Sequence, residues 1–145
     1  MIDFVERLQE LLGEHNLTYQ ELAKQIQISR TCLYAWLKYK IPPKTQSLIK
    51  LAKFFNCPVD YFIGLTEETK ITFSDNPVAF AERSMSLIQE KKITPYRVCK
   101  ELHIETAMMT DWTKYGTLPS LYNLLMLTDY FNCSADYLLG LSDYK

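Results

Sequence analysis

The 145-residue sequence has only four glycines, too few for a glycine-rich loop of the kind that cradles phosphates. It also has no run of about 18 apolar residues, the length that a membrane-spanning helix needs. These absences exclude a nucleotide-binding loop and a membrane span. We therefore expect a soluble, cytoplasmic protein without a membrane partner.

Clustered metal ligands and catalytic groups are lacking as well. The cysteines Cys32, Cys57, Cys99 and Cys133 never stand at a CxxC spacing, and the two histidines are isolated. A zinc site needs clustered ligands, so we expect reduced, largely buried cysteines and no metal. No paired carboxylates or nucleophile–base arrangement falls on one predicted surface. The sequence predicts a protein that is not an enzyme, has no cofactor and binds no small molecule.

Acidic residues are absent from one long stretch of a chain whose formal net charge is only −1. Residues Ser29–Val59 contain no acid and six bases, namely Arg30, Lys38, Lys40, Lys44, Lys50 and Lys53. A positive stripe in a near-neutral protein is typical of a surface that meets nucleic acid.

The chain repeats itself at an offset of 76 residues. Phe4–Glu67 aligns with Phe80–Asp143 without a gap, and 21 of the 64 aligned pairs are identical. An ungapped match of this length indicates two copies of one domain. We therefore predict a first domain over 1–66, a linker over 67–76 and a second domain over 77–145.

Each copy is predicted to form five short helices and no strand, which makes the fold all-α. Apolar spacing from Phe4 to Leu12 marks the first helix, and Thr18 with Glu21 forms a capping box for a second helix that ends near Ile26. Ser29 caps a third helix that ends near Lys38, before the two prolines at 42 and 43. The fourth spans about Thr45–Phe55, and Asn56 can end it in a left-handed conformation. Pro58 suits the first turn of a fifth helix that ends near Gly64. In the second copy the caps are predicted at Asn76 (with Pro77 as first helical residue), Ser120 and Ser134.

The second and third helices of the first copy have the properties that a helix-turn-helix requires. Ala23 is small enough for a close helix crossing, and Ile28 supplies the apolar plug of the turn. At 100° per residue the third helix turns Leu33, Trp36 and Leu37 inward. The same phase turns outward the positions Arg30, Thr31, Tyr34, Ala35 and Lys38.

This pattern resembles the lambda-repressor-like (Xre, or Cro/repressor) helix-turn-helix family over nearly the whole chain, twice. The residues that carry the resemblance are Leu17-Thr18, Glu21-Leu22-Ala23, Ile28-Ser29-Arg30, Trp36, Lys40, Pro43, Leu48, Leu51-Ala52-Lys53 and Asp60-Tyr61. The resemblance implies two tandem five-helix domains. It also implies a transcriptional regulator of bacterial or phage type, a repressor, that binds double-stranded DNA as a homodimer.

The resemblance also implies residue roles, by position. Base contacts in the major groove fall to Arg30, Thr31, Tyr34 and Ala35. Phosphate contacts fall to Tyr19, Ser29, Lys38, Lys40 and Lys44. The family usually has Gln where Tyr19 stands, which makes that contact a departure from the pattern.

The second copy departs further, because Glu105 and Asp111 stand where the first copy has Ser29 and Ala35. Residues Glu105–Ala135 carry one base, Lys114, against three acids, a net charge of −2 where the first copy has +6. We expect the first domain to bind DNA and the degenerate second domain to dimerise or to dock a partner. Two alternatives are a joined pair that reads two unlike half-sites, and a protein-interaction module or anti-repressor that binds no DNA.

Overall fold

The computed structural model describes residues 4–145, and their regular elements are all α-helices. No strand occurs over this range, so the prediction of an all-α fold is confirmed. The chain divides into two compact units, the first ending at Ile71 and the second spanning Thr72–Lys145. None of the described helices is long and apolar enough to cross a membrane.

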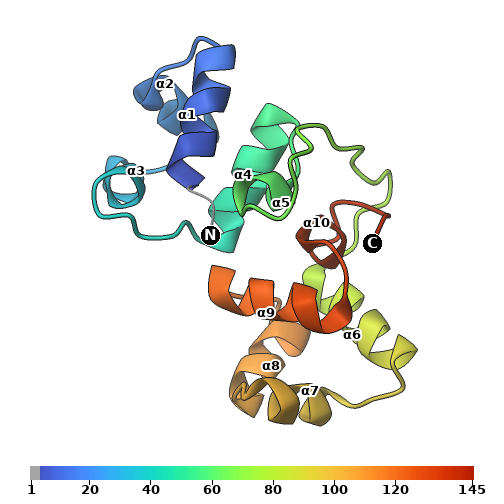
Figure 1. The fold of residues 1–145 in the computed structure, drawn as a ribbon. Helices are drawn as coiled ribbons and strands as arrows, with labels where there is room; N and C mark the ends of the chain where they lie inside the picture. The colour runs from blue at the N-terminus through green and yellow to red at the C-terminus, as the bar shows by residue number, and fades with distance from the viewer. Residues whose placement is uncertain (1–3) are drawn as a thin grey trace. The chain divides into compact units, whose positions relative to one another are not determined.

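Five helices follow one another in each unit (Figure 1). The first unit contains α1 (Phe4–Glu14), α2 (Tyr19–Ile26), α3 (Arg30–Leu37), α4 (Thr45–Phe55) and α5 (Val59–Phe62). The second contains α6 (Phe80–Glu90), α7 (Pro95–Leu102), α8 (Thr106–Lys114), α9 (Leu121–Phe131) and α10 (Ala135–Leu138). Every helix of the second unit begins 76 residues after its counterpart, as Phe80 follows Phe4.

The turns between the helices repeat at the same offset. Five residues of the first unit have a positive φ, and each has a counterpart 76 residues later that also has one. The pairs are Asn16 with Lys92, Gln27 with His103, Lys40 with Gly116, Asn56 with Asn132, and Gly64 with Gly140. A left-handed residue at a helix end reverses the chain direction in a few residues, so both units turn at equivalent places.

Side-chain caps fix several helix starts where the sequence predicts them. The Thr18 hydroxyl accepts a hydrogen bond from the Glu21 amide at 3.2 Å, and Glu21 accepts one from the Thr18 amide, so the capping box is confirmed. The caps at Ser29, Ser120 and Ser134 are also confirmed. Pro58 stands one position earlier than predicted, at the N-cap of α5.

The predicted start of the second copy's first helix, with Asn76 as cap and Pro77 as first residue, is wrong. Helix α6 begins at Phe80 and has Ala79 at its N-cap, without a side-chain cap bond. The preceding segment instead packs on the end of the second unit. The Ser74 amide donates to the Leu141 carbonyl at 2.8 Å, and a Cβ on Gly140 would lie 1.8 Å from the Val78 carbonyl oxygen. This close backbone approach keeps Val78 out of the helix.

The core of each unit contains one tryptophan. Trp36 is 2% exposed, and its ring meets Phe4 edge-on at 5.5 Å between centroids. Trp112 is equally buried and meets Phe80 in the same way at 6.0 Å. Both rings belong to the core, as their helical phase predicts, and they hold α3 and α8 against the first helix of their unit.

Candidate nucleic-acid interface

Helix α3 is anchored on one side and open on the other. The Ser29 hydroxyl caps it by accepting from the Cys32 amide at 3.1 Å, which fixes where the helix starts. Leu33 and Trp36 are buried and Leu37 is half-buried, so they attach the inner side of the helix to the core. The helix is thereby held rigidly while its opposite side faces solvent.

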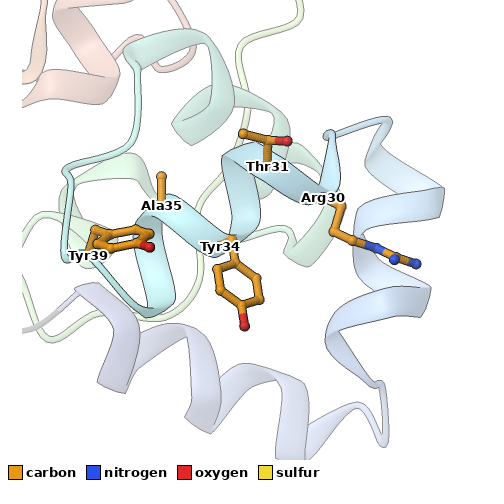
Figure 2. Close-up of a pocket in the computed structure, with 5 residues that line it drawn as sticks. All are labelled: Arg30, Thr31, Tyr34, Ala35 and Tyr39. Atoms are coloured by element: carbon orange, nitrogen blue, oxygen red, sulfur yellow. The ribbon is translucent and has the colours of Figure 1, made fainter.

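The four predicted base-contact residues lie together on the outer side of α3 (Figure 2). Arg30, Thr31 and Tyr34 are exposed, and Ala35 is half-buried. Together with Tyr39 they line a surface hollow of about 340 Å³. Tyr39 lies in the turn that follows α3, so the helical phase that predicts the other four does not reach it.

Four of the predicted phosphate contacts lie at the two ends of α3 and at the start of α4. Ser29 precedes α3, and Lys38 and Lys40 follow it, whereas Lys44 stands at the N-cap of α4, and all four are exposed. The Lys38 ammonium lies 5.5 Å from the centre of the Tyr34 ring and 5.7 Å from that of Tyr39.

Tyr19, the remaining phosphate candidate, is placed differently. Its side chain is half-buried, and its hydroxyl is shielded from solvent without a hydrogen-bond partner among residues 4–145. A phosphate contact from this residue therefore requires that its hydroxyl become accessible.

The stretch of sequence that contains α3 and α4 carries charge of one sign. All six bases between Ser29 and Val59 are exposed, and no acid occurs in this range. Within the described residues, no ion pair holds Arg30, Lys38 or Lys44. Their charges are free to meet a polyanion.

Proteins of known family are similar to part of this chain. A family model described as Helix-turn-helix matches residues 8–62. An uncharacterized HTH-type transcriptional regulator of Methanocaldococcus jannaschii is 42% identical over 55 residues, which are 37% of this chain and 83% of that protein. This chain belongs to the helix-turn-helix family.

Two further helix-turn-helix relatives are longer than the matched region. The HTH-type transcriptional activator BcrR of Enterococcus faecalis is 33% identical over 75 residues, 52% of this chain and 37% of BcrR. The uncharacterized HTH-type transcriptional regulator YobD of Bacillus subtilis is 31% identical over 65 residues, 45% of this chain and 58% of YobD. The chain thus spans between a third and three fifths of these two relatives. No solved structure matches it.

The helix-turn-helix itself is formed by α2 and α3. Gln27 ends α2 in the left-handed conformation, with φ 58° and ψ 51°, and the Ile28 amide donates to the Ala23 carbonyl at 2.9 Å. Ile28 is half-buried, which agrees with its predicted role as the plug of the turn. In the second unit His103 and Ile104 build the same turn between α7 and α8, with a matching 2.9 Å bond to the Cys99 carbonyl.

The outer side of α8 differs from that of α3 in chemistry. Glu105 and Asp111 are exposed where the first unit has Ser29 and Ala35. Large apolar side chains are exposed nearby in the sequence, with Met108 at 37%, Tyr115 at 74% and Tyr122 at 72%. The second unit therefore keeps the backbone of the motif and has acids in place of the cationic surface.

Proposed function

We propose that the chain is a sequence-specific DNA-binding transcriptional regulator, of repressor type, that inserts α3 into the major groove. One observation carries this proposal, namely that the outer side of α3 is exposed and flanked by cations without any acid from Ser29 to Val59. The relatives, two named as transcriptional regulators and one as a transcriptional activator, support the role of a transcriptional regulator.

Within this proposal the exposed side chains have separate tasks. Arg30 stands at the first residue of α3, where a guanidinium donates two hydrogen bonds to O6 and N7 of a guanine, worth about 1–3 kcal/mol of discrimination. Thr31, Tyr34 and Ala35 contact the neighbouring base edges. Ser29 and the lysines at 38, 40 and 44 contact phosphates, which sets register and affinity without reading sequence.

The second unit takes no part in DNA contact in this proposal. Acids at Glu105 and Asp111 repel phosphates, whereas the exposed Met108 and tyrosines suit contact with protein. We propose that this unit dimerises the chain, so that two copies of α3 read two half-sites about one helical turn apart.

Selection of bound sequences from a random duplex pool tests the proposal on the full chain. The wild type is expected to enrich one sequence. Arg30→Ala should relax the preference at one position and cost about 1–3 kcal/mol on the wild-type site. Lys44→Ala should weaken binding to all sequences alike and lower the slope of log affinity against log salt by about 0.9.

The second candidate is a protein-interaction module or anti-repressor that does not touch DNA, and the acidic, apolar side of α8 favours it. DNA binding at low salt distinguishes the two candidates. Binding to a nonspecific duplex that strengthens as salt falls supports the regulator, whereas no binding at low salt supports the interaction module.

A further inference from the structure

The hollow on α3 is shaped by apolar groups although it lies in the most cationic part of the chain. The rings of Tyr34 and Tyr39 and the methyl group of Ala35 line it, and Arg30 and Thr31 complete the lining toward the start of the helix (Figure 2). Tyr34 is 54% exposed and Tyr39 is 64% exposed. Aromatic surface of this extent gains stability when an apolar partner covers it.

Double-stranded DNA offers one apolar group in its major groove, the C5-methyl of thymine. We infer that the hollow takes the methyl edge of a thymine beside the guanine read by Arg30. This role rests on the proposed function, because it needs α3 in the groove. The absence of acids between Ser29 and Val59 favours DNA as the occupant, since every charge in that range attracts phosphate.

The helix spacing sets where the thymine lies. Arg30 and Tyr34 are four residues apart, which is about 6 Å along a helix that rises 1.5 Å per residue. Base pairs in B-DNA stack about 3.4 Å apart. The thymine is therefore expected within about two base-pair steps of the guanine.

The second unit lacks several of the residues that line this hollow on α3. Tyr115 is the counterpart of Tyr39, but Thr110 stands in place of Tyr34 and Asp111 in place of Ala35. A carboxylate at the Ala35 position puts a charge where the methyl group would be buried, and burial of an unpaired charge is costly.

Replacement of single thymines by deoxyuridine in the selected site tests this role, because it removes the methyl group and leaves base pairing intact. Burial of one methyl group is worth about a four-fold change in affinity. One thymine within two steps of the Arg30-dependent guanine should therefore show about a four-fold loss. In a site with cytosine at that position, 5-methylcytosine should bind about four-fold tighter than cytosine, for the same reason.

Two variants separate the hollow from the phosphate contacts. Tyr39→Ser removes an exposed wall outside the helix, and it should bring the thymine-to-deoxyuridine affinity ratio close to one. Lys44→Ala lies outside the hollow, so it should weaken binding to both duplexes alike and leave that ratio at about four. Circular dichroism of both variants checks that the helices are retained.

The outcomes distinguish the two levels of the proposal. If no sequence is enriched, the proposed function fails and the thymine contact fails with it. If a site is enriched but no deoxyuridine substitution weakens binding, or the ratio survives Tyr39→Ser, the thymine contact alone is overturned.

Discussion

Lys40 adopts a backbone conformation that side chains rarely take. Its φ is 54°, and its counterpart in the second unit is Gly116, with φ 71°. A left-handed conformation costs a residue with a Cβ about 1 kcal/mol relative to glycine. The first unit thus has an exposed cation at a position where glycine would adopt the backbone conformation at lower energy. This points to a role of the Lys40 side chain at the proposed phosphate contact.

The variant Lys40→Gly separates that use from stability. The equivalent turn of the second unit forms with glycine at this position, so a side chain is not required to make the turn. We expect Lys40→Gly to match or exceed the wild type in free energy of unfolding, by up to about 1 kcal/mol. Its affinity for all duplexes should fall, with a salt slope lower by about 0.9. Thermal unfolding and a salt titration measure the two effects. Unchanged DNA affinity would remove Lys40 from the interface.

Tyr19 presents the opposite case, a polar atom that is buried without a partner. A buried hydroxyl that makes no hydrogen bond costs about 1–3 kcal/mol. We expect Tyr19→Phe to raise the free energy of unfolding by about 1 kcal/mol, as measured by urea unfolding. If the hydroxyl turns outward to donate to a phosphate when DNA binds, the same variant should weaken binding by about 1 kcal/mol. A variant that is less stable than the wild type would show that the hydroxyl is satisfied in solution.

At the scale of elements, local signals predicted most of the helices. The capping box at Thr18, the Ser29 cap and the left-handed Asn56 each act within one turn, so the sequence alone places α2, α3 and the end of α4. The start of α6 could not be predicted in this way. It depends on the approach of Val78 to Gly140, and these residues lie far apart in the sequence.

The residues of the candidate interface were likewise predicted only where a local sequence signal identifies them. Helical phase separates Arg30 and Tyr34 from Leu33 and Trp36, because that separation follows from 100° per residue. Tyr39 was missed because it joins the hollow through the turn after α3, which periodicity does not describe. The identity of Tyr39 with Tyr115 is a sequence signal, but an identity alone does not distinguish a surface ring from a core ring.

A buried arginine of α1 forms hydrogen bonds with the end of the first unit. Its counterpart in the second unit forms fewer hydrogen bonds. Arg7 is 5% exposed, donates to the carbonyl of Tyr61 and, at 2.6 Å, to that of Thr66, and lies over the Tyr61 ring at 4.3 Å. Arg83 is half-buried, lies over the Tyr137 ring at 3.8 Å and makes one hydrogen bond, of 3.5 Å, to the Ser142 carbonyl. The ion pair of Arg7 with Glu67 adds little, since the Glu67 side chain is 86% exposed.

We therefore expect Arg7→Met to cost more stability than Arg83→Met. The first leaves two carbonyls without their charged donor and should cost about 2–4 kcal/mol, and the second about 1 kcal/mol. Each unit holds one tryptophan, so urea unfolding followed by Trp36 fluorescence in a Trp112→Phe background reports on the first unit. The reverse background, with Trp36→Phe, reports on the second. Equal losses would show that the geometry of the two arginines does not set their contributions.

At the scale of the whole molecule, the two units share one backbone arrangement but present surfaces of opposite charge. The helices and turns of the two units coincide at an offset of 76 residues, yet the net charge is +6 over Ser29–Val59 and −2 over Glu105–Ala135. The core positions and turn residues preserve the fold, and they do not constrain the exposed side of α3 or α8. Charge on that exposed side therefore distinguishes the roles of the two units.

The pair Lys38 and Lys114 tests this division directly, because the two residues are counterparts and both are exposed. In the proposed regulator, Lys38→Ala loses a phosphate contact, so affinity should fall by about 1 kcal/mol, roughly five-fold, and the salt slope by about 0.9. Lys114→Ala should leave both quantities unchanged, because Asp111 and Glu105 keep the second unit away from phosphates. Fluorescence anisotropy on the selected duplex, titrated with salt, measures both variants. Equal losses in the two variants, with an asymmetric footprint longer than one turn, would instead place both units on DNA as a joined pair that reads unlike half-sites.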